Sequence, residues 1–87
     1  MPSSSLKGKR VVIIGGTAGI GLAAAQAAAA AGAKVWAAGR SQAHIDKATA
    51  AANGSFEVRQ ADTHDANALK AIFDEVGTID HLVSAAV

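Results

Sequence analysis

The most constraining feature of the sequence is a glycine-rich turn, Gly15 to Gly21, that directly follows one apolar run and directly precedes another. The first run, 10–14, carries four β-branched residues, as expected for a strand buried on both faces. The second, 20–31, is mostly alanine and predicts a helix that ends at Gly32. A strand, a tight turn and a helix in this order leave free backbone N–H groups at the helix start. Such groups form a binding site for an anion such as phosphate.

The rest of the chain also alternates between strand and helix signals. Further strands are predicted at 34–38, 55–60 and 81–86. The one at 55–60 is expected to be more exposed than the first two, because its polar and apolar residues alternate. Ser41 is expected to cap a helix that has Ile45, Ala48 and Ala52 on one face and ends at Asn53-Gly54. The next helix has an apolar stripe and ends at Gly77; the stripe consists of Leu69, Ile72, Phe73 and Val76.

Helices that alternate with strands in this way connect parallel strands by right-handed crossovers. The predicted fold is therefore α/β with a parallel sheet of four strands. If the sheet is of the dinucleotide-binding type, it is a three-layer Rossmann-type sheet in the order 3-2-1-4, which is a truncated doubly wound fold. The first two helices are expected on one face of the sheet and the third helix on the other.

Composition limits both the core and the chemistry of any site. Hydrophobic residues make up 51% of the 87 residues, but 23 residues are alanine, so few large side chains remain and a free monomer is expected to be marginally stable. The absence of cysteine excludes disulfides, thiolate zinc sites and cysteine nucleophiles. A net charge of +1 does not favour nucleic-acid binding. His44, His64 and His81 are scattered without ligand spacing, so no metal site is predicted.

Residues 1–6 are predicted to form a flexible tail and 7–87 a single domain. Basic residues between positions 7 and 10, followed by a long apolar stretch, also resemble a secretory signal peptide. Against that alternative, four glycines within 15–21 and a later Gln26 interrupt the apolar stretch, which also makes it unsuited to span a bilayer. A cytoplasmic protein without membrane contact is expected.

The glycine turn resembles the Thr-Gly-x-x-x-Gly-x-Gly motif of the short-chain dehydrogenase/reductase family. Ile14 stands where the family has threonine. In such a turn the first glycine permits the sharp exit from the strand, the second lets the backbone approach a pyrophosphate, and the third allows close helix packing. Cofactor contacts are expected from Gly15, Thr17, Ala18, Gly19, Ile20 and Gly21. No Gly-Lys-Ser/Thr ends the turn, so the phosphate-loop pattern of nucleotidases is not met.

The resemblance covers nearly the whole chain and implies contacts at two more strand ends. Asp62 matches the family's aspartate after the third strand and would accept a hydrogen bond from the adenine amino group, with Thr63 beside it. An alternative, which does not exclude the first, is that Asp62 or Thr63 caps the helix that follows. The family's Asn-Asn-Ala-Gly corresponds to 84–87 here, which retains only Ala86 of that motif, so Ala85 and Ala86 are the expected contacts.

The residues after the second strand predict NADP rather than NAD as the cofactor. NAD-preferring relatives carry an acidic residue there to hold the ribose hydroxyls, but Gly39 occupies that position. Arg40 and Ser41 follow, and they offer a guanidinium and a hydroxyl to a 2′-phosphate. The alternative for Arg40 is an ordinary solvated charge.

The resemblance implies a reaction that this chain does not complete. Family enzymes transfer hydride between NADP(H) and a carbonyl or hydroxyl substrate with a serine and a Tyr-x-x-x-Lys pair, and the chain contains no tyrosine. No catalytic residue is assigned, and Ser84 is not given that role. The chain is therefore interpreted as the NADP-binding portion of such an oxidoreductase. It is expected to bind the adenosine half of the cofactor but not to transfer hydride unaided.

Two other functions are weighed against this one. The first is a non-catalytic or engineered minimal nucleotide-binding module. The second, a methyltransferase-like site, is disfavoured because it wants an acidic residue where Gly39 and Arg40 stand. In the order 3-2-1-4 the fourth strand, with Leu82 and Val83, is an uncovered edge, and the sheet face that carries only the third helix is partly bare. Self-association through these surfaces, giving a homo-oligomer, is expected.

Overall fold

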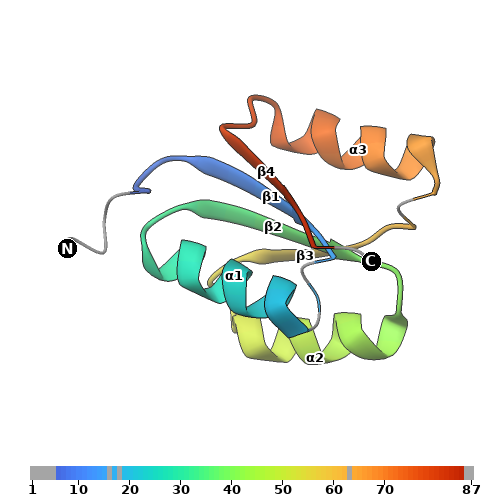
Figure 1. Ribbon diagram of the computed structural model, residues 1–87, viewed down its shortest axis with the longest axis horizontal. Helices are drawn as coiled ribbons and strands as arrows, with labels where there is room; N and C mark the ends of the chain where they lie inside the picture. The colour runs from blue at the N-terminus through green and yellow to red at the C-terminus, as the bar shows by residue number, and fades with distance from the viewer. Residues whose placement is uncertain (1–5, 16, 18, 63, 86–87) are drawn as a thin grey trace.

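Four strands and three helices alternate along the chain in the predicted order (Figure 1). The computed structural model describes residues 6–15, 17, 19–62 and 64–85. The elements are β1 (Arg10–Ile14), α1 (Gly19–Ala30), β2 (Lys34–Gly39), α2 (Gln42–Ala52), β3 (Glu57–Gln60), α3 (Ala66–Val76) and β4 (His81–Ser84).

The strands form one parallel sheet in the order β3-β2-β1-β4, which confirms the predicted α/β Rossmann-type fold. β1 lies between β2 and β4, and its last residue, Ile14, is opposite Ala38 on one side and Ser84 on the other. Because parallel strands run the same way, all four end at one edge of the sheet, which we call the carboxyl edge. The turns and loops that leave these strands begin there.

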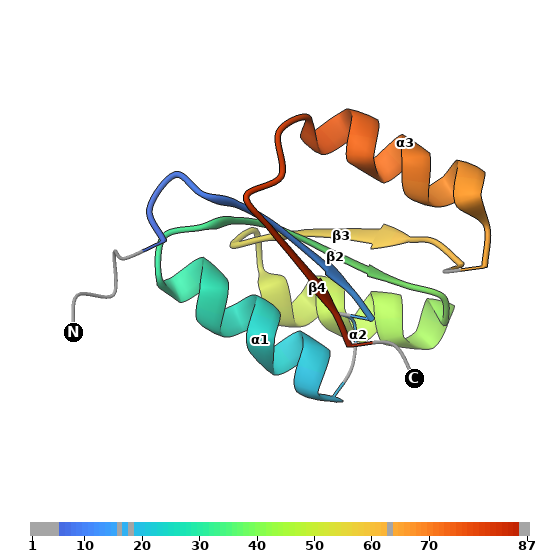
Figure 2. The same cartoon turned by 45° about the horizontal axis from the view of Figure 1, so that its top comes forward.

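Successive residues of β1 face opposite sides of the sheet and divide the core in two. Val11 and Ile13 pack against the α1 and α2 side, where Ala25 is fully buried. Val12 and Ile14 pack on the other side with the α3 stripe. Figures 1 and 2 show α1 and α2 on one face and α3 alone on the other, as predicted.

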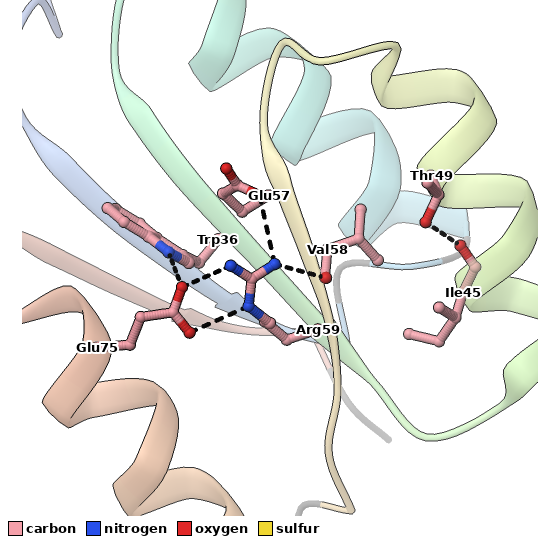
Figure 3. Close-up of polar contacts among 7 residues, drawn as sticks. All are labelled: Trp36, Ile45, Thr49, Glu57, Val58, Arg59 and Glu75. Atoms are coloured by element: carbon pink, nitrogen blue, oxygen red, sulfur yellow. Dashed lines mark hydrogen bonds and ion pairs between the residues drawn. The ribbon is translucent and has the colours of Figure 1, made fainter.

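A polar network fastens α3 to the sheet (Figure 3). The Arg59 guanidinium on β3 donates from Nε to Glu75 Oε1 at 3.0 Å and from Nη2 to Glu75 Oε2 at 2.6 Å. The Trp36 indole N–H on β2 donates to the same carboxylate at 3.2 Å. At the end of α3, Arg10 Nη1 donates to the carbonyl of Val76 at 2.6 Å, where a cation also suits the negative end of the helix dipole. These contacts fix how α3 lies on the sheet.

β3 begins two residues later than the predicted strand 55–60, because the residues before it take part in the end of α2. Asn53 takes a left-handed conformation with φ 46°, and its N–H donates to the carbonyl of Thr49 at 3.2 Å. Both the N–H and the hydroxyl of Ser55 then donate to the carbonyl of Ala52. Ser55 is therefore part of the helix termination and not of the strand.

The cap of α3 is Asp65, whose Oδ1 accepts hydrogen bonds from the N–H groups of Asn67 at 3.0 Å and Ala68 at 3.2 Å. The expectation that Asp62 or Thr63 caps this helix is wrong. Thr63 lies outside the described residues, and Asp62 closes the turn before the helix: its Oδ1 accepts from the His64 N–H at 2.9 Å. By contrast, Ser41 caps α2 as predicted and accepts from the His44 N–H at 3.4 Å.

Residues 6–9 are bound to the opposite edge of the sheet from the carboxyl edge. The Leu6 N–H donates to the Ala31 carbonyl at 3.2 Å, and the Lys9 carbonyl accepts from the Lys34 N–H at the start of β2 at 2.8 Å. Leu6 also packs on the core. Residues 6–9 thus contact both the end of α1 and the start of β2.

β4 is an edge strand whose four residues are all exposed, with Leu82 56% and Val83 40% accessible. Leu82 lies opposite Val12, so this exposed side chain is on the α3 face, which was predicted to be partly bare. An apolar hollow, which the sequence did not indicate, lies on the opposite face between α1 and β4. Its lining includes Val11 and Ile13 of β1, Ala24 and Ala28 of α1, and Val83.

Replacing Asp65 by alanine removes the acceptor for two N–H groups at the start of α3. We expect the free energy of unfolding, measured by urea denaturation, to fall by about 0.5–2 kcal/mol, the usual effect of losing a helix cap. Asp74→Ala is the matched control, because it makes the same chemical change on α3 but breaks only an exposed ion pair with Lys70. An Asp65→Ala loss no larger than that of the control contradicts the assignment of the cap.

The Glu75 carboxylate makes stability depend on pH. Hydrogen bonds from the Arg59 side chain hold the pKa of Glu75 below its ordinary 4.5, and the same contact raises the pKa of Arg59. A pKa lowered by folding means that the stabilisation is complete above the unfolded-state pKa and is lost as the pH falls through the folded-state pKa.

We therefore expect Glu75→Gln to lower the free energy of unfolding at neutral pH by up to about 1 kcal/mol, a small effect because solvent screens a partly exposed pair. The difference from wild type should disappear once Glu75 is protonated in both states. Urea denaturation followed by the fluorescence of Trp36, the single tryptophan, measures both. Asp74→Asn is the control, and a Glu75→Gln effect that persists unchanged in acid contradicts the ionic origin.

Candidate functional site

The glycine turn leaves β1 at the carboxyl edge and leads into the start of α1. Gly15 has φ 84°, and its N–H donates to the Ala38 carbonyl at 2.7 Å, which ties the beginning of the turn to β2. Gly19 begins α1 with φ 56°, and a Cβ placed on it would meet no atom within 4 Å. Ile20 is 86% exposed, whereas Gly21 is buried. The start of α1 therefore has open space where a side chain on Gly19 would lie, and the first N–H groups of a helix have no partner within the helix, as a phosphate site requires.

Thr17 lies inside this turn rather than on its surface. Only 4% of it is accessible, and it is the one buried polar residue in the described part of the chain. Its side chain packs against Gly39, the last residue of β2: a Cβ built on Gly39 would lie 2.9 Å from Thr17 Cβ and 2.8 Å from Cγ2, and closer still to Oγ1. The turn and the end of β2 thus touch directly, a contact that sequence reasoning missed.

Arg40 and Ser41 follow at the junction between β2 and α2. Arg40 is exposed, and within the described residues its guanidinium makes no hydrogen bond or ion pair. Its carbonyl accepts from Gln60 Nε2 at 3.2 Å, which holds the backbone here against β3. Ser41 caps α2, whose first turn contains no acidic residue. A free cation, a hydroxyl and a helix start therefore share one short segment.

Asp62 reaches the same edge of the sheet from β3. The Ala61 N–H donates to the Gly39 carbonyl at 2.8 Å, so the chain after β3 continues beside the end of β2. Asp62 is half-buried, and its Oδ1 accepts the His64 N–H. Among the described residues, its second oxygen, Oδ2, accepts no hydrogen bond and takes part in no ion pair, so within this part of the chain that oxygen is available as an acceptor.

The remaining predicted contacts divide between described and undescribed residues. Ala85 lies at the carboxyl edge, where its N–H donates to the Ile14 carbonyl at 2.7 Å. Ala18, Thr63 and Ala86 lie outside the described residues. The structure therefore brings Gly15, Thr17, Gly19, Ile20, Gly21, Arg40, Ser41, Asp62 and Ala85 to one edge of the sheet.

The described residues of the chain contain no cluster of three or more histidine, aspartate and glutamate side chains suited to a metal ion. None of the helices among them is long and apolar enough to cross a membrane.

The chemistry of this edge fits a dinucleotide. Free N–H groups at the start of α1 suit a pyrophosphate, an unpaired guanidinium suits a further phosphate, and a carboxylate oxygen on the far side suits an amino group. These groups come from the ends of β1, β2 and β3, while α1 and α3 leave the sheet toward opposite faces. Ligands of open α/β sheets bind at such a divergence of the connections.

Comparison with known proteins shows the family of the chain. The family model for short chain dehydrogenase matches residues 9–87. No curated protein matches the chain. A solved short chain dehydrogenase/reductase family protein is 33% identical with a TM-score of 0.82, over 93% of this chain and 34% of that one.

Two further solved structures are similar. A short chain dehydrogenase from Bacillus anthracis is 28% identical with a TM-score of 0.79, over 95% of this chain and 36% of its own. An actinorhodin polyketide ketoreductase solved with NADPH shares the fold, at 21% identity and a TM-score of 0.78 over 91% of this chain and 33% of its own. The chain thus spans about a third of the length of these structures, and the match over nearly all its residues shows that it belongs to the short-chain dehydrogenase/reductase family.

Proposed function

We propose that residues 7–87 form the NADP-binding half-domain of a short-chain dehydrogenase/reductase oxidoreductase. The observation that carries this proposal is the free Arg40 guanidinium, which lies beside Gly39 at a site where an NAD-binding relative would have a carboxylate. The family binds a nicotinamide dinucleotide, so the open question is which one and through which residues.

The pyrophosphate would be held by the turn that includes Gly15, Gly19 and Gly21. The open space where a side chain on Gly19 would lie supports this assignment, as do the first N–H groups of α1, which have no partner within the helix. Adenine would be held from the other side by the unpaired oxygen of Asp62. When bound, the nicotinamide ring supplies the hydride chemistry, and the residues of this chain only bind and orient the adenosine half.

The 2′-phosphate of NADP would lie against Arg40 and Ser41. Arg40 carries a charge that no described acidic group neutralises, and the Ser41 hydroxyl can donate a hydrogen bond while its oxygen accepts the His44 N–H. No acidic residue in the first turn of α2 opposes a phosphate. The ketoreductase of the same fold, which was solved with NADPH, is compatible with this choice but is a different protein.

The chemical step needs groups that this sequence does not supply. The chain has no tyrosine, so the proton transfer that accompanies hydride transfer in the family must come from residues elsewhere. The second candidate is a non-catalytic nucleotide-binding module. A natural reading frame that continues past Val87 into a Tyr-x-x-x-Lys helix would decide for the oxidoreductase. Cytoplasmic location stays a prediction, to be tested by fractionation of cells that produce the protein.

Replacing Arg40 by alanine tests the choice of cofactor. Calorimetric titration of the wild type with NADP, NAD and 2′,5′-ADP should give tighter binding of the two ligands that carry a 2′-phosphate. Arg40→Ala should weaken both by roughly ten- to a hundredfold, because one charge-assisted contact is lost, and should leave NAD binding unchanged.

Lys47→Ala is the matched control, since it removes one exposed positive charge from the middle of α2. It should change all three affinities by less than about twofold through screened long-range charge alone. An unchanged ratio of NADP to NAD affinity in Arg40→Ala overturns the assignment of Arg40, and a wild type that binds neither NADP nor 2′,5′-ADP overturns the proposed function.

Self-association through β4 belongs to the same proposal. Within the described residues β4 is paired only with β1, so its outer edge offers a template for another strand, and the hollow beside α1 leaves further apolar surface uncovered. We expect the 8.6 kDa chain to sediment as a larger species at micromolar concentration, and Leu82→Lys to shift it toward the monomer. Ile20→Lys places the same change on another exposed side chain and should not. A wild type that sediments purely as a monomer contradicts this expectation.

A further inference from the structure

The contact between Thr17 and Gly39 suggests why position 39 carries glycine. Gly39 ends a regular strand and, unlike Gly15 or Gly19, does not have a positive φ, so its backbone conformation is one that any residue adopts. The space around it is what excludes a side chain: the three nearest atoms to a Cβ on Gly39 all belong to Thr17. The glycine is thus required by one neighbouring side chain.

That side chain cannot move aside by rotation alone. Two of the three close atoms, Oγ1 and Cγ2, would turn with χ1, but Thr17 Cβ at 2.9 Å stays where the backbone puts it. A β-branched side chain also fills two of its three staggered positions, so rotation replaces one close atom with another.

The end of β2 is equally unable to move away. The Gly39 carbonyl accepts from the Ala61 N–H at 2.8 Å, and the preceding carbonyl, of Ala38, accepts from the Gly15 N–H at 2.7 Å. These two bonds join β2 to the chain on either side of it. Relief of a clash at position 39 therefore requires either a shift of the glycine turn or a smaller residue at position 17.

We propose that Thr17 is a specificity-determining residue that acts on the cofactor through position 39. The Thr17 side chain fills the space beside Gly39, so an aspartate or glutamate at position 39 does not fit. The end of β2 therefore lacks the carboxylate that would hold the ribose hydroxyls of NAD and repel a 2′-phosphate. Arg40 then meets that phosphate without a competing negative charge. This inference rests on the proposed NADP function, but the contact on which it depends is tested without any cofactor.

The contact is tested by a double-mutant cycle on thermal stability in the full chain. Gly39→Ala in the wild type should lower Tm by more than about 4 °C, as overpacking of a rigid site does in a domain of this size. In a Thr17→Gly background the same change should cost much less or raise Tm, because alanine suits a strand better than glycine once the space is free.

Thr17→Ala is measured as a second background and should give partial relief, since it leaves only the Cβ contact. Gly54→Ala is the control: Gly54 lies after α2, at the opposite edge of the sheet, so its effect should be the same in every background. If Gly39→Ala alone fails to fold and the Thr17→Gly/Gly39→Ala protein folds, the contact is supported. Equal costs in all backgrounds, or failure to fold in all of them, overturn it.

The role in specificity is tested with Gly39→Asp, which introduces the carboxylate. Calorimetric titration should show that Thr17→Gly/Gly39→Asp shifts the ratio of NAD to NADP affinity toward NAD by roughly ten- to a hundredfold relative to Thr17→Gly alone. Gly39→Asp without the Thr17 change should be unstable or lose affinity for both.

The outcomes separate this inference from the proposed function. A wild type that binds no dinucleotide, together with a non-additive cycle, refutes the function and with it the role in specificity but leaves the contact standing. Clear NADP binding with an additive cycle refutes the inference alone. A non-additive cycle without the shift toward NAD overturns the role of Thr17 in specificity.

Discussion

Strand β1 is hydrogen-bonded to a parallel neighbour on each side and covered by helices on both faces, and the other elements take their places from it. Its apolar residues from Val11 to Ile14 are all buried, so the strand supplies core side chains to both faces of the sheet. Because Ile14 is held between β2 and β4, the glycine turn starts from a fixed point. The Gly15 hydrogen bond to β2 extends that constraint into the turn itself.

The position of the candidate site follows from the connections around this strand. The chain leaves β1 toward the α1 face and leaves β3 toward the α3 face, so the connections diverge to opposite faces at the carboxyl edge. Backbone N–H groups from α1, a cation from the β2 end and a carboxylate from the β3 end meet there. None of these groups is close to another in sequence, and the parallel sheet alone brings them to one edge.

The features that depend on short-range patterns were predictable. The β-branched run, the alanine helix and the stripe from Leu69 to Val76 each encode burial within a few residues, so element order, strand order and helix placement were all predicted. Features decided by competing local hydrogen bonds were less predictable: Asp62, Thr63 and Asp65 are all able to cap a helix, and only the geometry of the turn selects Asp65.

The packing of Thr17 on Gly39 joins two segments far apart in the sequence, and a glycine at a strand end gives no local sign of what fills the space beside it. The start of β3 was predicted too early because the hydrogen bonds of Ser55 to the end of α2 have no counterpart in the strand pattern.

Because residues 6–9 are bound at the start of β2, the amino-terminal side of the molecule is suited to immobilisation in binding experiments. Leu6 and Lys9 are hydrogen-bonded at the edge from which the strands begin, and the cofactor groups gather where the strands end. A sensor surface that captures the protein by its amino-terminal side would therefore present the candidate site to the flowing ligand. Immobilisation through the exposed residues of β4 would instead place the surface beside Ala85 and the end of β1, where it obstructs the approach of a dinucleotide.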